Sequence, residues 1–366
     1  MTNSYYYIEL FKLKLVLQVN IIILVILFVI SIVYHFRLVV KEKKDDQRLK
    51  KLNQIFSECL QQKPSFTKKL FPKAYLKVEY FLPVLEKYQE LFFGDYWEKF
   101  KEFIIHNLLE KNIQKNLISR SWQKRGIAIR TLIISPSTDN EKYIEVLLRD
   151  KIPLIRFNAA ICALKIKTER LINKVLEALS QEDAAKRYPY RDALINSDHF
   201  VHKTIAQRLK IEKDPKVRIA ALQILSLKIG YVTLDMIEED LQAEDASRRW
   251  WAVKALENVP SKETVEILIK MADDPVWQVQ AAVLGILGKM HDKQALDTLI
   301  RKIHDPVLWV RLHAALSLKE IGEEGIEILE NLDPEKDKNA YEIASYVLSL
   351  PPFHLEEWRN KWPDFN

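Results

Sequence analysis

One residue position recurs every 31 residues through about half of this chain. Six of its seven occurrences are arginine, although lysine and arginine together make up only 56 of the 366 residues. We call this position the arginine column; it comprises Arg125, Arg156, Arg187, Arg218, Arg249, Gln280 and Arg311. Strict recurrence at such a period is the signature of a repeat protein, in which each unit buries its apolar face against the next.

Two further columns keep the same spacing and are mostly apolar, one three residues and the other seven residues after the arginine column. The first contains Ala128, Ala159, Tyr190, Ala221, Ala252, Val283 and Ala314, and the second contains Leu132, Ala163, Leu194, Leu225, Leu256, Leu287 and Leu318. Positions i, i+3 and i+7 share one face of an α-helix. A second amphipathic stretch follows in each unit, for example residues 262–272. We therefore predict an all-α fold, an α-solenoid of about seven 31-residue helix pairs.

Each arginine of the column borders the predicted buried face near a helix N-terminus, where the helix dipole disfavours a cation. It therefore needs hydrogen-bond acceptors. Acidic candidates lie upstream in most units, at Asp150, Asp183, Asp214, Asp245, Asp274 and Asp305. We predict that Asp and Arg pair between neighbouring units and stabilise their stacking rather than bind a ligand. Pro189 follows Arg187 closely, so we expect that helix to begin near Pro189 and Arg191 to replace Arg187.

The N-terminal part of the chain has a different character. Residues 15–33 are apolar except for Gln18, Asn20 and Ser31, which is long enough for a helix across a bilayer. We predict a short non-cytoplasmic N-terminus at 1–14, a transmembrane helix at 15–38 and a basic juxtamembrane linker at 39–72. Lys and Arg are concentrated after the apolar run, which predicts that the repeats are cytoplasmic.

Capping segments are predicted on both sides of the repeats, because terminal repeats are usually atypical. The N-terminal cap spans residues 73–118: one helix opens at Pro83, and a single amphipathic helix runs from Asp95 to Ile118. The repeats occupy residues 119–335. Residues 336–366 form a C-terminal cap and an aromatic tail containing Trp358 and Trp362.

The repeat motif resembles that of the HEAT-repeat family. The resemblance is carried by DPKVRIAAL at Asp214–Leu222 and by DPVLWVRLHAALSL at Asp305–Leu318, and it covers residues 119–335. The short period is similar to that of the bacterial, phycobilisome-lyase-type HEAT-like repeats. This resemblance implies a helical solenoid that offers a surface to a protein partner, and it does not specify an activity.

No catalytic, cofactor-binding or metal-binding constellation is predicted. HEAT-like proteins similar to deoxyhypusine hydroxylase bind iron through His-Glu dipeptides, and none of the eight histidines here precedes a glutamate. His199 and His202 could share a helix face as metal ligands, but a solvated helix start is the preferred interpretation. Residues 1–51 carry nine Lys/Arg and four Asp/Glu, which accounts for +5 of the net charge of +6. The nearly neutral repeats therefore do not indicate nucleic-acid binding.

Three tryptophans occupy slots that other units fill with small, polar or proline residues: Trp251, Trp277 and Trp309. They are candidates for partner contact, with structural packing as the alternative. We predict a membrane-anchored scaffold without cofactor that binds a protein partner, itself membrane-associated, at the cytoplasmic face of a bacterial inner membrane, in an envelope or polysaccharide system. The alternative is a HEAT-like enzyme, or enzyme subunit, of the lyase or DNA-repair type. The sequence leaves the oligomeric state open.

Overall fold

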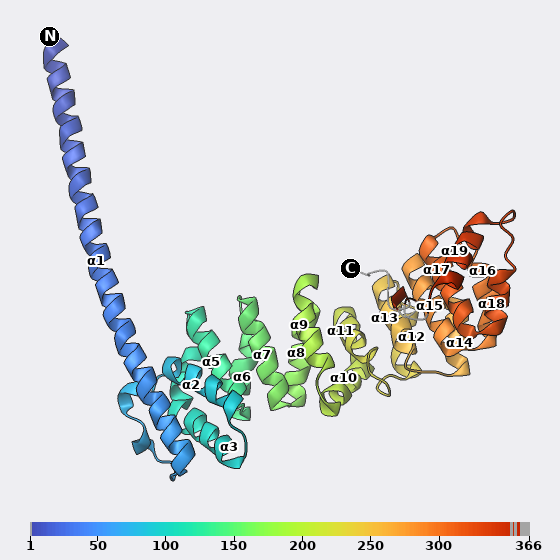
Figure 1. Ribbon diagram of the computed structural model, residues 1–366, viewed down its shortest axis with the longest axis horizontal. Coiled ribbons are helices and arrows are strands. Elements are labelled where there is room, and N and C mark those ends of the chain that lie inside the picture. The colour runs from blue at the N-terminus through green and yellow to red at the C-terminus, as the bar shows by residue number, and fades with distance from the viewer. Residues whose placement is uncertain (1, 352–353, 355–356, 359–366) are drawn as a thin grey trace. The chain divides into compact units, whose positions relative to one another are not determined.

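The computed structural model describes residues 2–351, 354 and 357–358. Most of the predicted tail, including Trp362, lies outside these residues. The chain divides into two compact units, Met1–Ser135 and Pro136–Asn366. The described residues form helices and contain no β-strand, which confirms the predicted all-α fold (Figure 1).

The first unit contains one very long helix and several short ones. Its α-helices are α1 (Thr2–Gln62), α2 (Val78–Leu91), α3 (Asp95–Glu102), α4 (Glu110–Leu117) and α5 (Trp122–Ile134). A π-helical segment, η3 (Phe103–Leu109), joins α3 to α4. Two 3₁₀ turns, η1 (Lys68–Leu70) and η2 (Lys73–Tyr75), lie between α1 and α2.

Helix α1 combines an apolar and a packed part. Its side chains from Leu17 to Val40 are all exposed, and the helix is long and apolar enough to cross a membrane. The predicted linker at 39–72 is not a separate segment, because α1 continues without interruption to Gln62. The physical reason is an apolar face: Leu52 and Phe56 are fully buried, and the ring of Phe56 lies 5.2 Å from that of Phe100.

The helices after α1 also differ in detail from the prediction. Helix α2 begins five residues before Pro83, because Val78 and Phe81 are fully buried and favour an earlier start. The predicted helix from Asp95 to Ile118 is continuous in direction but contains the π-helical segment η3. Such a segment inserts one residue per turn and rotates the faces on either side of it.

The second unit consists of helix pairs that follow one another in chain order (Figure 1). The first helices of the pairs are α7 (Pro153–Ile166), α9 (Ala184–Ile195), α11 (Pro215–Leu225), α13 (Ala246–Leu256), α15 (Trp277–Met290) and α17 (Leu308–Ile321). The second helices are α6 (Glu141–Leu147), α8 (Glu169–Gln181), α10 (His199–Ile211), α12 (Leu234–Leu241), α14 (Lys262–Met271), α16 (Leu296–Lys302) and α18 (Glu323–Glu330). The 3₁₀ turns η4 (Thr138–Asn140) and η5 (Lys293–Ala295) precede α6 and α16, and α19 (Lys338–Ser349) ends the unit.

Both apolar columns form the core. Every residue in them is at most 2% exposed, including the one aromatic member, Tyr190. The second helices contribute a column of their own, in which Ile237, Leu268 and Leu299 are fully buried. The fold prediction is therefore confirmed at the level of individual positions.

Helix α9 differs from the expectation that it would begin near Pro189. It begins at Ala184 and contains Pro189 in its interior. Arg187 consequently remains in the first turns of the helix, in the same place as the other members of the arginine column. Arg191 does not replace it; its guanidinium lies 5.9 Å from the centre of the Tyr188 ring.

Candidate functional site

The arginine column lies in the first helices and clamps the turn that precedes each of them. In six of the seven units the side chain donates a hydrogen bond to the backbone carbonyl six residues earlier. The pairs and their distances are Arg125–Ser119 (2.8 Å), Arg156–Asp150 (2.8 Å), Arg218–Glu212 (2.9 Å), Arg249–Ala243 (2.7 Å), Gln280–Asp274 (2.6 Å) and Arg311–Asp305 (2.8 Å). Arg187 donates instead to the carbonyl of Glu182, five residues earlier, at 2.7 Å. The column therefore satisfies backbone carbonyl groups of the turn that connects the two helices.

The predicted aspartates have different hydrogen-bond partners in different units. Asp274 pairs with Arg249, at 2.6 and 2.9 Å. By contrast, the side chains of Asp214, Asp245 and Asp305 each accept a hydrogen bond from the backbone N–H two residues later, at 2.9, 2.7 and 2.9 Å. An aspartate before a helix is used in this way because the N–H groups of the first turn have no other acceptor. Asp150 accepts similarly from Ile152, at 2.9 Å.

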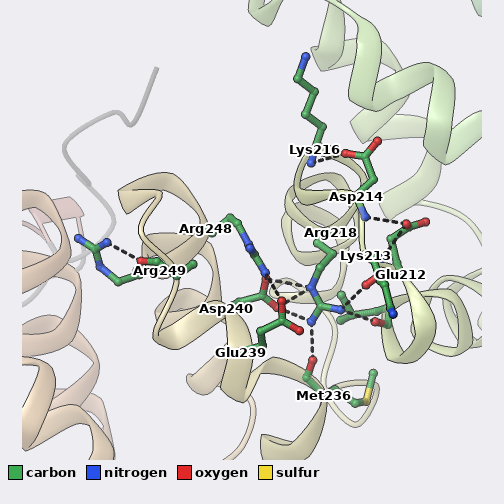
Figure 2. Close-up of polar contacts among 12 residues, drawn as sticks. Glu212, Lys213, Asp214, Lys216, Arg218, Met236, Glu239, Asp240, Arg248 and Arg249 are labelled. Atoms are coloured by element: carbon green, nitrogen blue, oxygen red, sulfur yellow. Dashed lines mark hydrogen bonds and ion pairs between the residues drawn. The ribbon is translucent and has the colours of Figure 1, made fainter.

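Figure 2 shows the most deeply buried member of the column. The side chain of Arg218 is 5% exposed and that of Asp240 is fully buried. Arg218 Nε lies 2.9 Å from both carboxylate oxygens, and its other nitrogens donate to the carbonyls of Leu209, Glu212 and Met236. Arg248 donates to the same Asp240 oxygen through Nε, at 2.9 Å, and Nη2, at 2.7 Å. One buried carboxylate thus holds two guanidinium groups.

Gln280 shows how the column tolerates a neutral residue. Its Nε2 makes the carbonyl contact, and its Oε1 accepts a hydrogen bond from Lys302 Nζ at 2.9 Å. Lys302 occupies the position that Asp240 occupies two units earlier, since 302 − 240 = 62, twice the repeat of 31. An arginine therefore faces an aspartate in one unit, and a glutamine faces a lysine in another.

Sequence reasoning missed Asp240, Arg248 and Lys302. The available signal was a charge in a second-helix slot that elsewhere holds Leu209 or Met271. A charge in an otherwise apolar slot needs a buried partner, and the column position 22 residues earlier supplies it.

The second helices line a cavity of about 670 Å³ in the second unit. Its walls come from α6, α8 and α10 and from the turns that follow them, with Arg156 of α7 and Val217 of α11. We call it the α6–α8–α10 groove. The lining residues are Glu145, Leu148, Arg149, Asp150, Arg156, Lys174, Glu177, Ala178, Ser180, Gln181, Glu182, Arg208, Glu212, Asp214 and Val217.

Charges of both signs alternate along this groove and pair with one another. Lys174 Nζ lies 2.7 Å from Glu177, and Arg208 bridges Glu177 and Glu212 at 3.7 and 2.6 Å. Burial raises the pKa of Glu212, but hydrogen bonds from the Asp214 N–H and from Arg208 outweigh it, and the net pKa is lowered. Glu212 is therefore ionised near neutral pH. At the base of the groove, Arg156 forms a two-pronged ion pair with the nearly buried Glu182.

The three candidate tryptophans do not come together. Trp251 packs edge-on against the buried Trp250, with ring centroids 4.5 Å apart. Trp309 lies 6.3 Å from Trp358 of the C-terminal segment, so the chain itself covers part of it. Trp277 is half-buried at the start of α15. Partner contact at these residues remains a prediction.

The two histidines considered as metal ligands have protein partners. His199 Nδ1 lies 2.7 Å from the Tyr231 hydroxyl, and His202 Nε2 lies 3.0 Å from the Leu194 carbonyl. Within the described residues, no group of three His, Cys, Asp or Glu side chains is placed to hold a metal ion. Burial raises the pKa of the Cys162 thiol to about 12, so this thiol is protonated at neutral pH.

Residues 203–284 and 265–345 match the model for HEAT repeats. This part of the chain is therefore similar to HEAT repeats. The match supports the resemblance seen in the motif, and it does not distinguish the bacterial lyase-type branch. A search among curated proteins finds no match to this chain.

Among solved structures, the chain is similar to the karyopherin Kap121p, with 11% identity and a TM-score of 0.52. The alignment covers 77% of this chain and 41% of Kap121p, so the chain spans about two fifths of that protein's length. YibA of Escherichia coli aligns over 77% of this chain and 98% of its own, with 16% identity and a TM-score of 0.39. Human deoxyhypusine hydroxylase aligns over 65% and 94%, with 17% identity and a TM-score of 0.28. The likeness to Kap121p supports the solenoid fold, and the other two carry no further argument.

Proposed function

We propose that this protein is a membrane-tethered scaffold whose repeats bind a protein partner without catalysis of their own. HEAT repeats suggest protein interaction, since solenoids offer extended surfaces. The observation that carries the proposal is the α6–α8–α10 groove, a large concave surface on the second helices with dense and alternating charge.

The groove chemistry fits a charged polypeptide segment. Its ion pairs are partly exposed: the Lys174 and Glu177 side chains are 28% and 30% exposed. Pairs of this kind contribute only about 0–1 kcal/mol each, so a partner can exchange them for its own at little cost. Arg149 also lines the groove, and its side chain is exposed.

The tether is helix α1. Its exposed apolar side chains from Leu17 to Val40 have no counterpart in a water-soluble surface. In a bilayer they would contact acyl chains, and the Lys and Arg residues that follow would lie on the cytoplasmic side. The resemblance to anchored HEAT-like proteins suggests a bacterial inner membrane, with an envelope or polysaccharide system as the setting and a membrane-associated partner.

A site-specific crosslinking experiment tests the partner site. A photo-crosslinking amino acid replaces Lys174 in the groove of the full chain, and a matched control replaces Tyr188, which lies on a first helix and is 66% exposed. We expect one stoichiometric adduct from position 174 in intact membranes, and its loss in the Arg208→Glu variant. Equal adducts from both positions, or none from position 174, would contradict binding in the groove.

The tether is tested separately, by extracting membranes that contain the full chain. We expect the chain to resist high salt and alkaline carbonate and to be released by detergent. Release by carbonate alone would show that α1 does not span the bilayer.

A further inference from the structure

A second basic segment lies in the first unit, separated along the sequence from the basic stretch that follows the apolar part of α1. Residues 111–125 read KNIQKNLISRSWQKR, with five Lys or Arg and no Asp or Glu. Two large apolar side chains interrupt it: Ile118 is 70% exposed and Trp122 is 48% exposed. The exposed cations around them are Lys111, Lys115, Arg120 and Lys124.

The contacts between α1 and α2 show which end of the unit this surface occupies. The Tyr80 hydroxyl lies 2.7 Å from both Asp45 and Arg48 of α1. Two turns later in α2, the Tyr88 hydroxyl donates to the carbonyl of Asn53, at 3.1 Å. Helix α2 therefore runs alongside α1 in the same direction, away from the apolar segment.

Helices α3 and α4 then run back. The Tyr96 hydroxyl near the start of α3 donates to the carbonyl of Cys59, near the far end of α1. Asn112 in α4 donates to the carbonyl of Leu76, just before α2 begins. Helix α4 continues five residues beyond Asn112, which is about 8 Å at 1.5 Å per residue. The turn between α4 and α5 is thus directed toward the end of the unit from which the apolar part of α1 emerges.

The α4–α5 turn reaches a level close to the basic stretch of α1. Val40, the last residue of the exposed apolar run, precedes Arg48 by eight residues, or about 12 Å of helix. The contact between Tyr80 and Arg48 places the start of α2 beside Arg48. Leu76 precedes Tyr80 by four residues, about one helical turn. The turn and residues 41–44 therefore lie on the same side of the unit.

The turn is also held in place. Arg125, the first member of the arginine column, donates to the carbonyls of Ser119 and Arg120, at 2.8 and 3.1 Å. The Ser121 N–H donates to the Ser119 hydroxyl, at 3.2 Å. Arg120 and Trp122 are consequently displayed from a clamped turn.

We propose that this turn is a lipid-contact surface: Ile118, Arg120 and Trp122, with Lys115 and Lys124, lie on the anionic headgroups of the membrane that α1 spans. Tryptophan favours the interface between headgroups and acyl chains, and each lysine or arginine near an anionic surface adds about a fivefold gain in association. The inference rests on the proposed anchoring by α1. With α1 it fixes the first unit to the membrane at two points rather than one.

The test measures the depth of three positions in the full chain, reconstituted in vesicles of phosphatidylcholine and phosphatidylserine. A fluorophore is attached to Trp122→Cys at the turn, to Phe93→Cys as the matched control, or to Phe28→Cys within α1. Phe93 is 93% exposed in the turn between α2 and α3, at the opposite end of the unit. Both native cysteines are buried, which leaves the introduced thiol as the reactive one. Arg120→Cys replaces Trp122→Cys if the latter perturbs folding.

Quenchers on the lipid headgroup should act on the label at 122 and not on the label at 93, whereas quenchers on the acyl chain should act on the label at 28. Charge reversal at Lys115 and Lys124 should abolish quenching at 122 and leave that at 28 unchanged. Quenching at 28 without quenching at 122 would overturn the lipid-contact surface and leave the anchor intact. Loss of quenching at 28 would overturn the anchor and, with it, the surface.

Discussion

Replacing Arg218 by methionine should destabilise the middle of the second unit far more than breaking an exposed ion pair of the same type. Methionine keeps most of the volume of the side chain and removes its five donors. Three carbonyls, those of Leu209, Glu212 and Met236, then lose the hydrogen bond from the guanidinium, and two of these contacts are buried. An unsatisfied buried acceptor costs about 1–3 kcal/mol, and breaking a buried ion pair costs about 3–5 kcal/mol.

These terms overlap, and Arg248 still compensates Asp240, so we expect a loss of about 3–5 kcal/mol rather than the sum. Arg301 provides the matched control. It pairs with Asp273 through two contacts of 2.6 and 2.8 Å, but the two side chains are 53% and 57% exposed. Arg301→Met should therefore cost no more than about 1 kcal/mol.

The assay is hydrogen exchange followed by mass spectrometry on the detergent-solubilised full chain. A local measurement is needed because a solenoid does not unfold as a single two-state unit. Amides of α11 and α12 should exchange about a hundredfold to a few thousandfold faster in Arg218→Met, since 1.4 kcal/mol corresponds to a factor of ten. Asp240→Asn should be at least as damaging, because it leaves the buried guanidinium of Arg218 without a carboxylate and leaves Arg248 only the exposed Glu239, at 3.5 Å. Equal effects of Arg218→Met and Arg301→Met would refute the reasoning.

Three further predictions concern packing, pH and the arginine column. A Cβ on Gly325 would lie 1.9 Å from a backbone oxygen of α17, whereas one on Gly126 would meet nothing within 4 Å. In thermal unfolding, Gly325→Ala should therefore cost about 1–3 kcal/mol of stability, and Gly126→Ala should be neutral or stabilising. The reverse order would contradict this packing. Burial lowers the pKa of Lys254 from 10.5 to about 8, so the unfolded state binds more protons between these pH values and the free energy of unfolding should rise with pH across that window. Lys254→Met should stabilise the fold by about 1–3 kcal/mol at pH 7 and remove this rise, as measured by denaturant titrations. An unchanged pH dependence in the variant would exclude the assignment. Gln280→Arg should destabilise the second unit by about 1–2 kcal/mol, because it places a second cation beside Lys302. Adding Lys302→Glu to this variant should restore the melting temperature. Failure of that rescue would show that the two positions are not coupled.

The role of the arginine column was predictable only in part. Its place beside the buried face follows from its spacing to the two apolar columns, and the need for acceptors follows from the position of a cation near a helix N-terminus. The acceptor common to the units is a backbone carbonyl, which every residue carries and no sequence pattern reveals. For this reason Gln280 can serve in the column, since one N–H donor meets the requirement.

The carboxylate partners were less predictable, because their distance along the chain varies. Glu182 lies 26 residues after Arg156, Asp240 lies 22 after Arg218, and Asp274 lies 25 after Arg249. The second helices between them differ in length, from 13 residues in α8 to 8 in α12. Asp240 lies inside α12, whereas Glu182 and Asp274 lie in the turns that follow α8 and α14.

Periodicity by itself determined the solenoid, the helical type and the buried columns, because burial along stacked helices repeats with the unit and leaves a mark at every turn. Tertiary structure alone decided where α1 ends, which acid meets which arginine, and which end of the first unit bears the clamped basic turn. Those features depend on contacts between residues far apart in the chain, such as Tyr80 with Asp45 and Asn112 with Leu76. Local composition does not encode such contacts. By composition the polar stretch after Val40 resembles a linker, whereas the burial of Leu52 and Phe56 makes it part of helix α1.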